Sequence, residues 1–75
     1  MEIKWEDGHA IKVRVDSGST VVISANREGL LSLARQLTAM ANEEVGSHIH
    51  YDEYSSLEEG SVELIVERIS DGESL

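Results

Sequence analysis

Residues 26–45, NREGLLSLARQLTAMANEEV, form the one stretch of the chain with the length and the periodicity of a long helix. Its apolar side chains recur at steps of three and four residues, which is the spacing of one helix face. The residues predicted to face the core are Leu30, Leu31, Leu33, Ala34, Leu37, Met40, Ala41 and Val45. The residues predicted to face solvent are Ser32, Arg35, Gln36, Asn42 and Glu43.

Both ends of this helix carry residues that favour helix termini. Asn26 can accept a backbone N–H as the N-cap, and Glu28 complements the positive end of the helix dipole. Gly46 can adopt the left-handed conformation that ends many helices. We therefore expect one helix that runs from Asn26 to about Val45.

Alternating apolar and polar residues precede the helix in three short runs, which predict three strands. Their apolar members are Ile3, Trp5, Ile11, Val13, Val15, Val21 and Ile23. A three-residue loop with Gly8 in the left-handed conformation would set Trp5 opposite His9 and Ile3 opposite Ile11. A second such loop at 16–18 would set Val13 opposite Val21, so that one face of the sheet is apolar.

Two further strands are expected after the helix, at 48–52 and 61–69, with a loop at 53–60 between them. In the second of them Val62, Leu64 and Val66 should face the helix. The prediction is therefore an α+β fold of order βββαββ, in which one helix packs on a five-stranded, mainly antiparallel sheet with strand order 3-2-1-5-4. Residues 1–75 are expected to form a single small domain with a frayed polar tail at 70–75.

Charge is distributed very unevenly along the chain. Residues 1–42 carry five acidic and five basic residues, whereas residues 43–75 carry ten acidic residues and only Arg68 as a base, a net of −9. An acidic surface repels nucleic acid and anionic membranes and speeds association with a basic protein. The chain has no cysteine, no signal peptide and no apolar run near the roughly 18 residues of a membrane span, so a cytoplasmic protein is expected.

No catalytic motif is present, and we expect no enzymatic activity and no cofactor. There is no nucleophile elbow, and a chain this short has little room to bury a nucleophile, a base and an orienting acid together. One alternative is a metal site: His48, His50 and Asp52 alternate along one strand and would share a face. Two imidazoles and a carboxylate are acceptable ligands for zinc or non-haem iron.

The loop after this strand carries the features of a protein-binding surface. It combines an aromatic and an aliphatic residue with a rim of carboxylates, a composition that suits a basic protein partner. The candidate contact residues are Asp52, Glu53, Tyr54, Leu57, Glu58 and Glu59. A different role for Leu57 is also open, since this side chain can fold under the loop and close the core.

Three segments, ISANREGLLSLA (23–34), HIHYDEY (48–54) and LEEGSVELIVERI (57–69), together resemble the immunity protein 32 family of bacterial polymorphic toxin systems. The resemblance covers most of the chain from Ile23 onward. It implies a small protein that neutralises a cognate toxin by binding it, without catalysis. The family-like positions are Gly29, His48, His50, Asp52, Glu58, Glu59 and Gly60.

The function expected from the sequence is therefore a non-enzymatic, cytoplasmic immunity protein that binds a basic toxin domain through its acidic half. The first alternative is a small metal-binding domain built on the two histidines and Asp52. The second is a structural homo-oligomer that pairs exposed strand edges or buries Val22 and Ile65. Monomer and homodimer both remain open.

Overall fold

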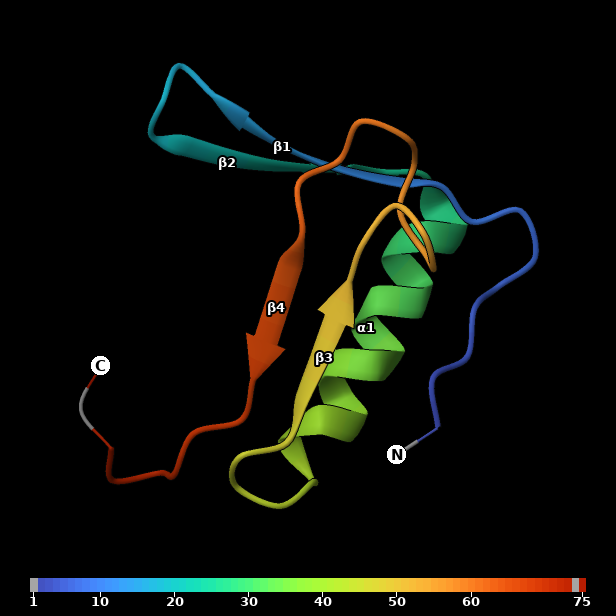
Figure 1. Cartoon of the computed structure of the whole chain (residues 1–75). Coiled ribbons are helices and arrows are strands. Elements are labelled where there is room, and N and C mark those ends of the chain that lie inside the picture. The colour runs from blue at the N-terminus through green and yellow to red at the C-terminus, as the bar shows by residue number, and fades with distance from the viewer. Residues whose placement is uncertain (1, 74) are drawn as a thin grey trace.

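Figure 1 shows the computed structural model, which describes residues 2–73 and 75. The elements in chain order are β1 (Ile11–Asp16), β2 (Thr20–Ala25), α1 (Arg27–Ala41), β3 (His48–Tyr51) and β4 (Leu64–Glu67). β1 pairs antiparallel with β2, and β3 pairs antiparallel with β4. The α+β class is confirmed. The predicted five-stranded sheet with order 3-2-1-5-4 is wrong, because the described strands form two separate two-stranded sheets.

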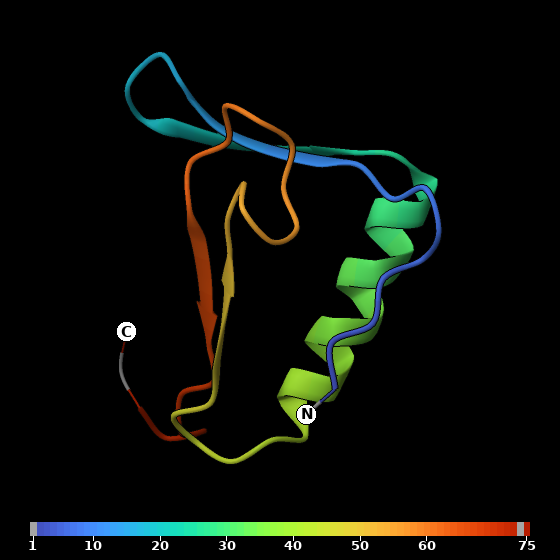
Figure 2. The same cartoon turned by 45° about the vertical axis from the view of Figure 1, so that its right-hand side comes forward.

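The predicted first strand, around Ile3 and Trp5, is instead an extended segment that runs along α1 (Figure 2). Helix side chains take the place of a sheet partner for its backbone. The Glu6 N–H donates to Ser32 Oγ at 2.9 Å, and Gln36 Nε2 donates to the Lys4 carbonyl at 2.8 Å. Alternation alone cannot distinguish a strand from a segment whose backbone is bonded in this way.

The turn that follows this segment agrees with the sequence prediction. Gly8 has φ +79°, in the left-handed region, and the His9 N–H donates to the Glu6 carbonyl at 3.1 Å. The Trp5 and His9 rings stack with their centroids 4.4 Å apart, and the Trp5 ring meets Tyr51 edge-on at 6.0 Å. The predicted proximity of Trp5 and His9 is therefore confirmed, although the two residues are not paired in a sheet.

Helix α1 buries a different face from the predicted one. Gly29, Ser32, Gln36 and Met40 are buried, whereas most of the leucines and alanines are exposed. The side chains wrongly predicted to be buried are Leu30, Leu31, Ala34, Leu37, Ala41 and Val45. Ser32 and Gln36 are inside because the hydrogen bonds to the N-terminal segment satisfy their polar atoms, which removes the main cost of burying them.

The N-terminus of α1 is as predicted, but its C-terminus comes earlier. Asn26 Oδ1 accepts the Gly29 N–H at 2.8 Å, as an N-cap does, and Glu28 lies in the first turn. The helix ends at Ala41 with Asn42 as C-cap, four residues before Val45. Gly46 has φ +94° but does not end the helix; its N–H donates to the Arg68 carbonyl, which brings the chain alongside β4.

The register of the first hairpin differs from the prediction by two residues. Val13 lies opposite Ile23 and Val15 opposite Val21, not Val13 opposite Val21. The reason is the turn: Ser17 and Gly18 both have positive φ, at 51° and 79°, and the Ser19 N–H donates to the Asp16 carbonyl at 3.3 Å. Such paired left-handed residues match the twist of a hairpin. A shift of two residues keeps every side chain on its predicted face.

β3 and β4 do not extend the first sheet because the chain between them leaves β1 after a short contact. The Glu58 and Val62 N–H groups donate to the carbonyls of Ile11 and Val13 at 2.8 and 2.9 Å, and the chain then turns into β4. In Figure 1 the β1–β2 hairpin lies across the top and β3–β4 runs down beside α1. Leu64 and Val66 are half-buried, as predicted, whereas Val62 is exposed.

The core lies where the two hairpins and α1 meet. Its buried apolar side chains are Ile11, Val13, Met40, Ile49, Tyr51 and Leu57. Trp5, Ala25, Leu33, Leu64 and Val66 pack against them from the rim. At the C-terminal end, residues 70–73 form a turn in which the Glu73 N–H donates to the Ser70 carbonyl, and Arg68 pairs with Asp71 at 3.2 Å. Residue 74 of the expected frayed tail lies outside the described residues.

Candidate functional site

The loop at 52–60 is organised by Asp52, the first residue after β3. Its Oδ1 accepts hydrogen bonds from the Tyr54 and Ser55 N–H groups at 3.1 and 3.0 Å and from Ser55 Oγ at 2.9 Å. Its backbone carbonyl accepts the Ser56 and Leu57 N–H groups at 3.0 and 2.8 Å. An aspartate suits this position because its short side chain can bond the backbone two and three residues ahead. The chain is therefore held in a tight turn immediately after β3.

The rest of the loop is tied to itself and to β1. Glu53 Oε2 accepts the Gly60 N–H at 2.9 Å, which closes the loop. The Glu58 N–H donates to the Ile11 carbonyl, and the Val13 N–H donates to Ser61 Oγ at 3.1 Å. These contacts hold the loop at both ends and in the middle, so its exposed side chains project from a fixed backbone. No pattern in the sequence indicates the bonds to β1, because they join segments almost 50 residues apart.

The residues predicted to bind a partner divide into two groups. Tyr54 is 91% exposed, and Glu53, Glu58 and Glu59 are exposed around the same loop. A hollow lined by Glu53, Tyr54 and Glu59 lies between them. Leu57 is only 6% exposed and belongs to the core, which agrees with the alternative in which it folds under the loop. Asp52 acts on the loop backbone and not as a surface charge.

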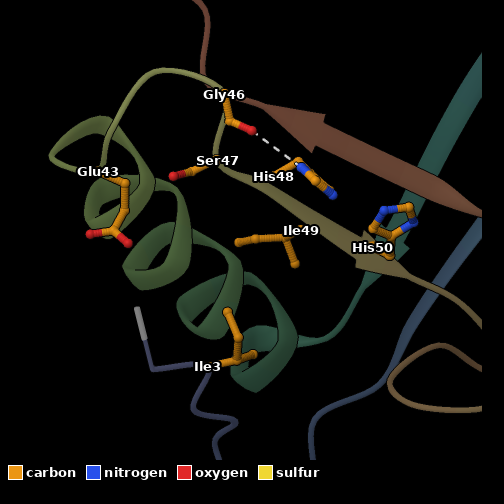
Figure 3. Close-up of a pocket in the computed structure, with 7 residues that line it drawn as sticks. All are labelled: Ile3, Glu43, Gly46, Ser47, His48, Ile49 and His50. Carbon is orange, nitrogen blue, oxygen red and sulfur yellow. Dashed lines mark hydrogen bonds between the residues drawn. The ribbon is translucent and has the colours of Figure 1, made fainter.

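The two histidines of β3 lie on its outer face, away from the helix. Figure 3 shows Ile49 extending from β3 toward α1, with both imidazole rings on the opposite side of the strand. The ring centroids of His48 and His50 are 4.9 Å apart, and His48 Nδ1 lies 3.2 Å from the Gly46 carbonyl oxygen. This face also carries acidic residues from β4 and the chain just before it. Glu67 lies opposite His48 in the β3–β4 pair, and Glu63 Oε2 lies 3.3 Å from His50 Nδ1.

The third expected metal ligand does not join this pair in the structure. The Asp52 carboxylate faces the loop backbone and Ser55. Among residues 2–73 and 75, no three histidine, aspartate or glutamate side chains come together in a position to hold a metal ion. The metal hypothesis therefore rests on the histidine pair alone and stays a prediction.

The same described part of the chain contains no helix with the length and apolar character to cross a membrane. The search of curated proteins and that of solved structures both return no match. Comparison with protein families, in contrast, finds the model described as "Immunity protein 32", which matches residues 20–69. That range begins at the start of β2 and includes α1, both strands of the second hairpin and the whole 52–60 loop. The match extends over two thirds of the sequence, and the chain therefore belongs to the immunity protein 32 family.

Proposed function

We propose that this protein is a non-enzymatic inhibitor that binds a basic toxin domain through the acidic surface around Tyr54. The acidic surface is defined here as Tyr54 with Glu53, Glu58 and Glu59. Membership of an immunity protein family supports a protein partner. The choice of surface rests on the exposure of Tyr54. An aromatic side chain that stabilises its own protein is largely buried, whereas Tyr54 is 91% exposed.

A tyrosine in this position is suited to anchor a complex. Tyrosine is enriched among the residues that contribute most to binding, since its ring offers a large contact area with few rotatable bonds. The Asp52 bonds and the contacts with β1 already order the loop, so binding loses little conformational entropy there. The anchor and its surroundings are therefore arranged before a partner arrives.

The charge around Tyr54 favours a basic partner. Within the described residues Glu53, Glu58 and Glu59 form no ion pair, so their charges are available to a ligand. They belong to residues 43–75, which carry ten acidic residues against one arginine. A field of one sign raises the rate of encounter with an oppositely charged protein and weakens as salt is added.

The test compares two triple variants that have equal net charge. Glu53→Gln/Glu58→Lys/Glu59→Lys removes the negative charge of the acidic surface and leaves an amide oxygen at position 53 to accept the Gly60 N–H. Glu2→Lys/Asp7→Lys/Glu44→Gln makes the same change in charge at exposed positions outside it. Tagged protein is first used to isolate the toxin domain from host lysate at low and at moderate salt. Association of the purified pair is then followed by stopped-flow fluorescence.

We expect the first variant to slow association by about tenfold or more at low salt, and the second to slow it far less. Tyr54→Ala should weaken binding by about 2 kcal/mol, near 30-fold in Kd, mainly through faster dissociation. Equal effects of the two triple variants would mean that only total charge matters. Binding that is insensitive to both variants and to salt would exclude the acidic surface as the site.

A further inference from the structure

Helix α1 exposes an apolar side to solvent, although the core of this short chain contains only a small number of apolar side chains. We define the open helix face as Leu30, Leu33, Ala34, Leu37 and Ala41. Leu30 and Leu37 are 55% and 45% exposed, both alanines are exposed, and only Leu33 packs against the core. These residues recur at steps of three and four, so they line one side of the helix.

The other sides of α1 are covered by the chain itself. The N-terminal segment bonds to Ser32 and Gln36, and Glu6 pairs with Arg35 at 2.7 Å. Tyr51 of β3 reaches Gln36 at 2.8 Å. Successive residues turn by about 100° around a helix, which places Leu30 and Leu37 on the flank away from the N-terminal segment. The described residues cover that flank only in part.

The first hairpin exposes apolar side chains in the same way. Val15, Val21 and Ile23 lie on the same face of the hairpin as the buried Ile11 and Val13, because strand partners and alternate residues share a face. They are nevertheless 51%, 58% and 44% exposed. The inner end of this face, at Ile11 and Ala25, packs on the buried side of α1 at Gly29, and the exposed residues lie farther along the hairpin. Core positions of two elements are thus left in solvent.

The chain exposes more surface than a folded monomer of its mass, and the excess is comparable to one side of a dimer interface. A folded monomer of 8.3 kDa is expected to expose about 4,600 Å², whereas this chain exposes 5212 Å², on the order of 600 Å² more. A stable dimer buries about 800 Å² on each partner. The radius of gyration is 13.1 Å against about 11 Å for a compact chain of 75 residues. The protomer is therefore more open than a monomer of its size needs to be.

We propose that a second copy of this chain covers the open helix face, so that the protein is a homodimer. Charge favours this occupant over the basic partner of the acidic surface. Residues 11–41, which contain the open helix face and the hairpin, carry four basic residues and two acidic ones, a net of +2. A strongly basic protein is repelled there, whereas two copies joined at this face bring only +2 against +2 and keep their halves of net charge −9 apart.

The symmetry of a dimer fits the sequence of the open helix face. A two-fold axis sets the same surface of both copies against itself. With the axis between Leu33 and Ala34, two antiparallel α1 helices bring Leu30 of one copy against Leu37 of the other. The small Ala34 side chain at the crossing allows the helices to approach closely. The loop with Tyr54 shares no residue with the open helix face and stays available.

Sedimentation equilibrium of the full chain tests the proposal with a matched pair of variants. Leu30→Glu/Leu37→Glu places two charges in the proposed interface. Val62→Glu/Ile65→Glu places two charges at exposed apolar positions of the β4 region, outside it. We expect the wild type and the second variant to sediment at twice 8.3 kDa and the first variant at 8.3 kDa. Circular dichroism checks that each variant folds.

A wild type that stays monomeric at micromolar concentration would overturn the proposal and leave the open helix face for a different protein. A dimer that survives Leu30→Glu/Leu37→Glu but is broken by Val62→Glu/Ile65→Glu would place the interface elsewhere. If the first variant does not fold, the melting temperature of the wild type distinguishes a dimer from a monomer. It rises with protein concentration for a dimer, because mass action stabilises the associated state, and is independent of concentration for a monomer.

Discussion

The hydroxyl of Tyr51 donates to Oε1 of Gln36 at 2.8 Å, inside the core, and Gln36 Nε2 donates in turn to the Lys4 carbonyl. Both side chains are almost completely buried, with exposed fractions of 1% and 2%. The pair connects β3, α1 and the N-terminal segment through one amide group. A single buried polar side chain thus fixes the positions of three segments that share no sheet.

Tyr51→Phe is expected to lower the free energy of unfolding by about 1–3 kcal/mol, because it leaves a buried amide oxygen without a donor. Urea denaturation measures this difference. Tyr54→Phe is the matched control: its hydroxyl is in water, and its removal should have no measurable effect. Equal stability of the two single variants would contradict the role given to the pair.

Stability should also fall at alkaline pH because of the same tyrosine. Burial raises the pKa of the Tyr51 phenol above its ordinary value of 10.0, since the phenolate loses hydration inside the protein. The unfolded chain then releases the proton at a lower pH than the folded one. The stabilisation is therefore complete below pH 10.0 and is lost as the pH rises toward the pKa of the folded state. Urea unfolding on both sides of this pH should show the loss in the wild type and not in Tyr51→Phe.

Gly29→Ala should destabilise the protein, although alanine favours helices by about 1 kcal/mol over glycine. A Cβ at this position would lie 2.7 Å from the Ala10 carbonyl oxygen and 2.8 Å from Ile11 Cγ1. The backbone of the hairpin would have to move, and overpacking of this kind costs about 1–3 kcal/mol. Thermal unfolding checks the prediction, with Thr38→Ala on the exposed side of α1 as a control that keeps its stability. A higher melting temperature for Gly29→Ala would show that the contact relaxes freely.

Zinc should leave the stability of the protein unchanged at micromolar concentration. Within the described residues no third side chain joins His48 and His50 in a position to hold an ion, and two imidazoles leave a tetrahedral ion short of protein ligands. The melting temperatures of the wild type and of His48→Ala/His50→Ala should respond equally to added zinc. A rise in the wild type alone would instead indicate that Asp52 or a nearby glutamate completes a site, and would restore the metal hypothesis.

The sequence correctly predicted the parts of the structure that depend only on residues close to one another along the chain. The N-cap at Asn26 and the left-handed Gly8 follow from short-range hydrogen bonds and backbone sterics. The alternation of β1 and β4 placed Ile11, Val13, Leu64 and Val66 on the inner side, since a strand has only two faces. The same alternation was wrong about the burial of Val15, Val21 and Ile23, which are exposed. The exposed carboxylates around Tyr54 were also predictable, because charge distribution is a property of composition.

Tertiary contacts decided which face of α1 is buried and whether the N-terminal segment is a strand. Periodicity favoured the leucine side, but Ser32 and Gln36 are inside because backbone groups 26 and 32 residues away bond to them. The free energy of those bonds depends on the position of a distant segment, which no local window contains. The same holds for Leu57, whose burial follows from the attachment of its loop to β1. Sequence periodicity reports the preference of one element, whereas burial is settled by competition among all the surfaces that can pack against it.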